Sequence, residues 1–446
     1  MNSEIIISNA WICLVEGSRI TPRFGNLTIK DGRITAFRPL SFVDFISNPD
    51  NGEMDSFNAA GRAVTLPLVN FHDHIYSRLA KGLPISGPTD NFEHILSNLW
   101  WKLDMALDEE MIRASTQMTI LEALRNGVTT IFDHHASPAF TSGSLKIIAD
   151  ELETYHLRGV LCFETSDRNG KDKTREALEE NRRFIANHTN DNIKGMMGLH
   201  ASFTCSDATL QAAADVIHQL DAGIHIHLCE DPADTRISLQ KFALAPAARL
   251  EKFNLLNEKS ILSHSIHLKR EDYELIARTG SAIACNLDSN LNNAVGIPDF
   301  SNIPQSVPLL AGTDGMHDNL ARSMKQLFLL HRFQGNGFEV TFPWFQKICF
   351  DQLAFVRRYF PDYPSLQVND RADLVIWDYV PAAPLSEENF WGHYIYGILE
   401  RPVHSVMQAG CFLMENYRLT LMDEDRINRY IYLQGERLRN AFVKMG

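Results

Sequence analysis

Short apolar runs alternate with amphipathic, helix-like stretches through the middle of the chain. Many of the helix-like stretches repeat apolar residues with helical spacing, as residues 209–220 and 270–279 do. The runs are of strand length, and eight of them end near a polar residue: His72, His134, Glu164, His200, His227, His264, Asn286 and Asp314. Eight successive βα units predict an α/β fold, specifically a closed (β/α)8 TIM barrel.

The two ends of the chain have a different, β-rich pattern. Residues 4–14 and 26–37 read as strands, and Asp31-Gly32 inside the second stretch indicates a tight hairpin turn. Similar patterns return in residues 372–378 and 403–414. We therefore expect the two ends to pair into a small β-sandwich domain beside the barrel.

This organisation predicts four segments, the last of which is a terminal helix. The last segment repeats apolar residues at helical spacing, so it is expected either to clamp onto the barrel or to contribute to a homodimer interface. The predicted segments are 1–64 for the first part of the β-sandwich domain, 65–365 for the (β/α)8 barrel, 366–422 for the second part of the β-sandwich domain, and 423–446 for the C-terminal helix.

A long excursion, residues 76–126, follows the first predicted barrel strand. It contains a polar, Pro- and Gly-rich loop over residues 81–91 and then a segment with Trp100 and Trp101. Long insertions at a barrel mouth often act as lids or substrate walls. Trp100 is thus a candidate for stacking on a planar substrate, and packing in the core is the alternative for both tryptophans.

Charge and cysteine content narrow the classes of partner. The chain has 42 Lys and Arg against 55 Asp and Glu, a formal net charge of −13, and no long basic cluster. This disfavours nucleic acid and anionic membranes as partners. No apolar run approaches the length of a membrane span, and the seven dispersed cysteines suit reduced thiols. A cytoplasmic protein is expected.

Four side chains at predicted strand ends are suited to binding one metal ion. They are His72 and His74 in a His-x-His motif, His227 in a second such motif, and Asp314 in Thr-Asp-Gly. The C-terminal strand ends of a TIM barrel all face the same mouth. Imidazole and carboxylate ligands together suit zinc, which is the expected cofactor, with iron as the alternative. No glycine-rich nucleotide-binding motif is found in the sequence.

Two further residues supply the acid–base groups that hydrolysis needs. A divalent metal can lower the pKa of a water ligand to about 7, but protons must still be moved. Glu230 lies three residues after His227, close enough to transfer them without being a ligand. His264 ends the next strand-like run and could polarise the group under attack, while Asp314 could accept the second proton.

The order of these motifs resembles the amidohydrolase superfamily, in particular its single-metal branch of aminohydrolases and chlorohydrolases. Within that branch the chain looks most similar to the SsnA-type aminohydrolases associated with selenium or purine metabolism. The likeness extends over nearly the whole chain and is densest in residues 64–318. The stretches that carry it are residues 98–109, 133–139, 162–169 and 287–296.

The resemblance implies the same ligand set and the same catalytic roles for Glu230 and His264. It also implies that His200 faces the substrate from the fourth strand, the alternative being a structural histidine. His135 is a candidate substrate contact. For both His134 and His135, the alternative is to support the metal ligands from behind. The chain departs from the usual pattern at Leu68, where glycine is common, and at Ser202, where proline is common.

The predicted reaction is hydrolytic deamination of a purine- or pterin-like base, a small heterocyclic substrate. Hydrolytic dechlorination would use the same groups and stays an alternative. A two-metal amide-bond hydrolase is less favoured, because such enzymes resemble this chain but have a lysine where the fourth strand here ends in His200. A catalytically inactive binding protein is disfavoured because all six predicted ligand and acid–base residues are present.

Overall fold

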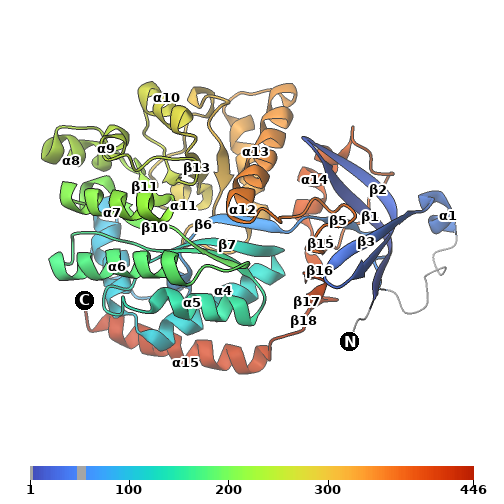
Figure 1. Ribbon diagram of the computed structural model, residues 1–446, viewed down its shortest axis with the longest axis horizontal. Coiled ribbons are helices and arrows are strands. Elements are labelled where there is room, and N and C mark those ends of the chain that lie inside the picture. The colour runs from blue at the N-terminus through green and yellow to red at the C-terminus, as the bar shows by residue number, and fades with distance from the viewer. Residues whose placement is uncertain (1–3, 48–56, 446) are drawn as a thin grey trace.

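The computed structural model describes residues 4–47 and 57–445. It places a barrel ringed by helices next to a smaller β-rich region that contains the N-terminal strands (Figure 1). The fold class predicted from the sequence, a TIM barrel with added β structure from both chain ends, is confirmed.

The barrel strands are buried along their whole length except at Lys194 and His227, which explains why they read as continuous apolar runs. They pair in parallel, and the fourth position is shared by two short strands, β9 and β10. Bridges between Asp73 and Asp314 and between Thr165 and Leu199 join the two halves into a closed ring. The strands are β6 (Leu68–Asp73), β7 (Val128–His135), β8 (Arg158–Phe163), β9 (Ile193–Gly195), β10 (Met197–Ala201), β11 (Ile224–Leu228), β12 (Ile261–His264), β13 (Ala282–Cys285) and β14 (Leu309–Ala311).

Helices follow each barrel strand and cover the outside of the ring (Figure 1). Those of the first excursion are η1 (Ile75–Ala80), α2 (Phe92–Ile95), the π-helix η2 (Leu96–Trp100), α3 (Trp101–Ala106) and α4 (Glu109–Arg125). The others are α5 (Ser144–Thr154), α6 (Lys171–Asn187), η3 (Ser202–Thr204), α7 (Asp207–Leu220), α8 (Pro232–Phe242), α9 (Pro246–Lys252), α10 (Arg270–Thr279), α11 (Leu287–Asn292), η4 (Phe300–Asn302), α12 (Leu320–Phe333) and α13 (Phe338–Tyr359).

Strands from both chain ends form one nine-stranded sheet. The two ends meet where β15 pairs with β5, and Asp31 and Gly32 make the predicted hairpin turn with positive φ angles of 51° and 76°. The strands are β1 (Ile5–Glu16), β2 (Arg19–Lys30), β3 (Arg33–Pro39), β4 (Phe57–Asn58), β5 (Ala63–Thr65), β15 (Leu374–Trp377), β16 (Val403–Gln408), β17 (Cys411–Glu415) and β18 (Arg418–Leu419). Short helices α1 (Phe42–Ser47), α14 (Phe390–Tyr396) and η5 (Ile398–Glu400) accompany this sheet.

The C-terminal helix α15 (Glu424–Val443) clamps onto the barrel, the first of the two roles considered for it. It packs across α4 and η1 through buried Ile427, Leu438 and Phe442, and Tyr430 donates a hydrogen bond to the Glu110 carboxylate. A contribution to a dimer interface stays a prediction, as do the four segment boundaries.

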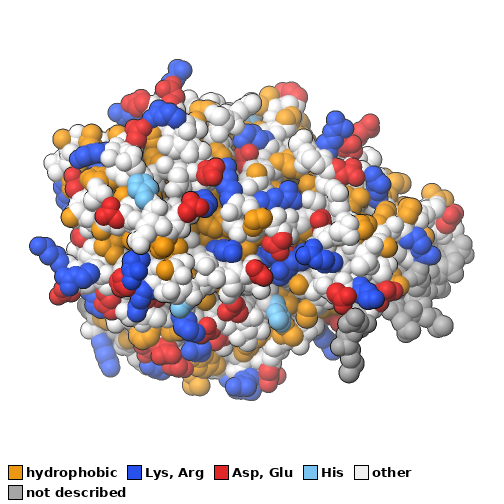
Figure 2. Space-filling model, in the orientation of Figure 1, with side chains coloured by type: hydrophobic (Ala, Val, Ile, Leu, Met, Phe, Trp, Pro, Cys, Tyr) orange, Lys and Arg blue, Asp and Glu red, His pale blue; other side chains and the backbone are white. Residues whose placement is uncertain are grey.

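The distribution of charge and hydrophobicity adds two observations. On the face shown in Figure 2, Lys and Arg side chains are interspersed with Asp and Glu rather than gathered in one stripe. Among the described residues, no helix is long and apolar enough to cross a membrane. The compartment in which the protein works stays a prediction.

Candidate active site

Four side chains predicted as metal ligands meet at the C-terminal mouth of the barrel. His72 comes from β6, His74 directly follows that strand, His227 comes from β11, and Asp314 comes from the turn after β14. One potential ligand atom from each lies within 4.8 Å of those of the other three. The Asp314 Oδ1 atom is 2.9 Å from His74 Nε2 and 3.2 Å from His72 Nε2. The strand ends therefore bring together side chains that are up to 242 positions apart in the sequence.

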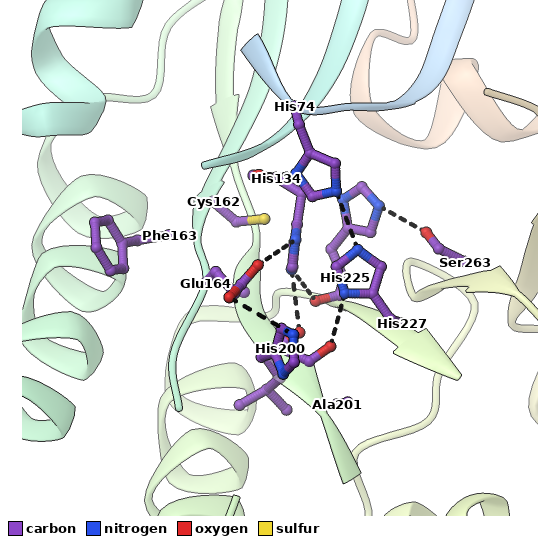
Figure 3. Close-up of polar contacts among 12 residues, drawn as sticks. His74, His134, Cys162, Phe163, Glu164, His200, Ala201, His225, His227 and Ser263 are labelled. Atoms are coloured by element: carbon purple, nitrogen blue, oxygen red, sulfur yellow. Dashed lines mark hydrogen bonds and ion pairs between the residues drawn. The ribbon is translucent and has the colours of Figure 1, made fainter. Parts of the chain in front are cut away.

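Backbone hydrogen bonds fix which nitrogen of two of these imidazoles faces the others. His74 donates from Nδ1 to the carbonyl oxygen of His134 at 2.6 Å, and His227 donates from Nδ1 to that of His200 at 3.0 Å (Figure 3). The two Nε2 atoms lie only 3.1 Å apart and beside a carboxylate oxygen, and in the neutral rings both carry lone pairs. Burial lowers the pKa of His74, but the Asp314 carboxylate outweighs burial and raises it to about 9, so this position favours a positive charge. Such a convergence of acceptors fits a bound cation.

The third imidazole, His72, is held by the other histidine of the second His-x-His motif. Its Nδ1 atom is 2.8 Å from Nε2 of His225, and its own Nε2 atom is buried without a hydrogen-bond partner. Burial lowers the pKa of His72 and of His227 well below the usual range, which favours the neutral, ligating form. Burial alone would raise the pKa of Asp314, but His74 and His72 hold it well below its usual range. The donor set fits a divalent metal.

Glu230 and His264 lie next to this cluster. His264 Nε2 is 3.6 Å from Glu230 Oε2 and 4.0 Å from Asp314 Oδ2. Its other nitrogen, Nδ1, donates to Oδ1 of Asn290 at 2.7 Å, which fixes the ring and aims Nε2 at the two carboxylates. Burial raises the pKa of Glu230, as suits a group that must both take up and release a proton.

The backbone is in the left-handed region at His264 and at Asp314, with φ angles of 67° and 54°. Non-glycine residues adopt this region sparingly, and when they do, they often lie at functional turns. His264 ends β12 and Asp314 lies in the turn after β14, so the local turn determines how their side chains enter the mouth.

A pocket of about 670 Å³, including its opening to solvent, lies over the cluster. His200 and Trp100 line it as predicted, together with Trp101 and Phe203. His135 does not line it: the residue is fully buried, and its Nε2 atom is 2.8 Å from Oγ of Ser137. The structure therefore brings two of the three candidate substrate contacts to the pocket, and a substrate contact by His135 remains only a prediction.

Several polar residues of the site had no role assigned from sequence. The Glu164 carboxylate lies between His134 and His200, 3.7 Å from His134 Nδ1 and 4.0 Å from His200 Nε2 (Figure 3). Arg168 and Asp104 join it in an ion-pair network. A Glu and an Arg four residues apart, directly after a predicted strand, were a signal for this pair. His225 and Asn290 could be found only from their contacts.

Comparison with known proteins places this site in a family. The chain is 26% identical over 451 residues to a 5-methylthioadenosine/S-adenosylhomocysteine deaminase of Desulforudis audaxviator, covering 99% of each chain. Its fold is similar to that of a zinc-bound adenosine deaminase from Xanthomonas campestris, with a TM-score of 0.81, 20% identity and 98% of each chain covered. It is also similar to that of a zinc-bound atrazine chlorohydrolase from Arthrobacter aurescens, with a TM-score of 0.78 and 19% identity, and the match covers 97% of this chain and 100% of the other. The Amidohydrolase family model matches residues 63–410, and the chain belongs to the amidohydrolase family.

Proposed function

We propose that His72, His74, His227 and Asp314 hold one divalent metal, zinc in the first instance, and that Glu230 and His264 move protons in the hydrolytic deamination of a purine- or pterin-like ring. The observation that carries the proposal is the convergence of imidazole lone pairs and a carboxylate in one buried cluster. Glu230 and His264 border that cluster and the pocket at the same time.

The predicted class of enzyme, a metal-dependent aminohydrolase of this family, agrees with the comparisons. The full-length relative is a deaminase of adenosine derivatives, and the adenosine deaminase of similar fold has bound zinc. A small aminated heterocycle is therefore the substrate class, and we propose a purine- or pterin-like base as its finer identity.

Hydrolytic deamination replaces a C–NH2 group by a carbonyl, with water as the source of oxygen. When bound, a divalent metal makes water more acidic and stabilises charge that develops on oxygen. Glu230 is placed to take a proton from the attacking water and to give it to a ring nitrogen of the substrate. His264 holds its Nε2 atom toward the reacting oxygen because Asn290 fixes the ring. The Oδ2 atom of Asp314 is available for the second proton, which leaves with ammonia.

The residues of the pocket divide into two proposed tasks. His200 is within reach of the substrate, and its Nδ1 atom is fixed by Oγ1 of Thr204 at 2.8 Å. Trp100 offers an aromatic surface and lines the pocket from the excursion after β6. A flat ring with hydrogen-bonding edges suits this mixture of aromatic and polar groups.

Two measurements test the proposal. Elemental analysis of the protein purified after zinc supplementation should give one metal per chain, and two metals at full occupancy or none would overturn the single-metal assignment. Ammonia release should then be measured over aminated purines, pterins, pyrimidines and their nucleosides. Turnover restricted to chlorinated triazines or acyclic amides would replace deamination by the dechlorinase or amide-bond alternatives while leaving the metal site in place.

A further inference from the structure

One side of the pocket is formed by a buried ion-pair network that ties the lid to the barrel. We define the lid as residues 92–106, which include α2, η2 and α3, and the lid wall as Asp104, Glu164 and Arg168. Arg168 Nη2 donates to Asp104 Oδ2 at 2.5 Å and to Glu164 Oε1 at 2.9 Å. The three side chains are 12% exposed or less, and all three line the pocket.

The charges that line the pocket are strongly unequal. Among its described lining residues, Arg168 is the only Lys or Arg. The carboxyl residues are Asp104, Glu164, Glu230, Asp231, Asp234 and Asp314. Burial raises the pKa of Asp104 and of Asp234 to about 7, so these two carry only part of a negative charge near neutral pH. A bound divalent cation would offset a further part of the excess, and the charge that remains disfavours a substrate that carries a phosphate or carboxylate.

Arg168 is already engaged by two carboxylates, which weakens its attraction for such an anion. Its Nη2 atom already serves two carboxylates, and its guanidinium lies 5.3 Å from the centre of the Trp101 ring, which covers one side of it. Recognition of a phosphate or carboxylate usually needs a guanidinium whose fork faces the ligand. The lid wall therefore turns the one cation of the pocket into a neutralised structural group.

The same side of the pocket retains unused hydrogen-bonding capacity. Nε1 of Trp101, Nε of Arg168 and Oδ1 of Asp104 are buried and have no hydrogen-bond partner. Buried polar atoms in folded proteins are nearly always bonded, so a cluster of unpaired ones beside a pocket points to a polar ligand. Both donors and acceptors are present in this cluster, as recognition of an uncharged ring edge requires.

We infer that the lid wall restricts the proposed deamination to uncharged or cationic heterocycles and rejects substrates that carry a phosphate or carboxylate. The inference rests on the proposed function for the reaction itself. Neutralising both wall carboxylates, as in a Glu164→Gln, Asp104→Asn double variant, would leave the positive charge of Arg168 unpaired at the pocket. That variant should gain tolerance for anionic substrates.

The test uses the zinc-loaded enzyme and substrate pairs that differ by one anionic group. The first pair is adenosine and adenosine 5′-monophosphate, followed by the best uncharged substrate of the ammonia panel and its carboxylated or phosphorylated analogue. We expect kcat/KM for the uncharged member to be higher by at least about 100-fold, because like-charge contacts in a binding site cost several kcal/mol. The double variant should reduce this ratio by at least about tenfold.

A matched control removes one carboxylate from the same lid but outside the pocket. Glu93 on α2 pairs with Arg236 of α8 and does not line the pocket, so Glu93→Gln should leave the ratio unchanged. If the double variant fails to fold, as judged by thermal unfolding and zinc content, the single variant Glu164→Gln is measured instead. It should reduce the ratio of kcat/KM values in the same direction by a smaller factor.

Binding separates this inference from the proposed function. Inosine and inosine 5′-monophosphate need no turnover, and calorimetry should show that only the uncharged member binds well. Equal use of both members of the pairs, or an unchanged ratio in the variants, would overturn the lid-wall inference while leaving the deaminase proposal intact. If the protein discriminated between the two members in binding but released ammonia from no substrate, the lid-wall inference would stand and the deaminase proposal would be overturned.

Discussion

The metal cluster and the lid wall form two sides of one pocket, and they are built in different ways. His72, His74 and His227 lie on or directly after barrel strands, and backbone carbonyls orient two of them. Asp104 and Arg168 meet across the space between a lid helix and a barrel loop, through side-chain charges alone. The metal cluster is the rigid side of the pocket and has the geometry that catalysis needs. The geometry of the lid-wall side depends on how the lid packs onto the barrel.

This difference indicates how the pocket separates two tasks. Groups that must be held within fractions of an ångström lie where neighbouring strands and their hydrogen bonds fix them. Groups that select a substrate can lie on a lid, because charge and polarity act over longer distances. Substitutions on the rigid side should therefore abolish metal binding or turnover, and substitutions around the substrate should change preference and efficiency.

The largest expected effect is that of His72→Ala. Removing one imidazole from the cluster should release the metal, and activity should fall by at least about 10³-fold, since the metal supplies several kcal/mol of stabilisation. Metal content and ammonia release measured on the same sample check this. His218 is exposed on α7, so His218→Ala is the control and should keep both. Full metal content in His72→Ala would show that this residue is no ligand.

Glu230→Gln should separate metal binding from chemistry. The amide keeps the size of the side chain but cannot shuttle a proton, so kcat should fall by at least about 10²-fold with the metal still bound. Single-turnover ammonia release and elemental analysis are the measurements. Loss of the metal would make Glu230 a ligand, and near-normal kcat would remove it from the reaction.

His225→Leu tests whether the rigid side depends on contacts behind the ligands. The change removes the acceptor for Nδ1 of His72, and metal affinity should fall by about 10- to 100-fold. Competition with a chelator gives the affinity, and excess zinc should restore most of the activity. His225→Gln retains an acceptor and should recover part of the affinity. Unchanged affinity in both variants would mean that His72 needs no such support.

The smallest expected effect is that of His200→Ala on the substrate side. Losing one hydrogen bond to the substrate should lower kcat/KM by about tenfold and leave metal content unchanged. Thr204→Val removes only the group that fixes His200, so its effect on kcat/KM should be weaker. Loss of metal in His200→Ala would show that His200 supports metal binding rather than substrate binding.

The sequence predicted the rigid side well because its residues all follow apolar, strand-like runs, and this pattern recurs along the chain. Each ligand ends an apolar strand, and parallel strands of one barrel must present their ends to one mouth. The positions of His227, Glu230 and His264 followed from the same logic. The strand boundaries also agree closely, as for β12, which ends at His264 as expected.

The lid wall and the supporting contacts could not be predicted in this way. Glu164 was seen as the end of a strand, but Asp104, which shares Arg168 with it, lies 60 positions earlier on a lid helix with no fixed register relative to the barrel. Likewise, the motif Asp133-His134-His135 gives no indication that the His135 side chain is buried and contacts Ser137. Side-chain direction at such places depends on packing between elements.

The sequence by itself determined the barrel, the order of its ligands and the class of chemistry, because strand periodicity and ligand type are local properties of the chain. Only the tertiary structure decided which nitrogen of each imidazole faces the cluster, which aromatic and acidic groups enclose the pocket, and that its one cation is already paired. These features arise from contacts between segments far apart in sequence, and their geometry is set when the lid and the loops pack onto the completed barrel.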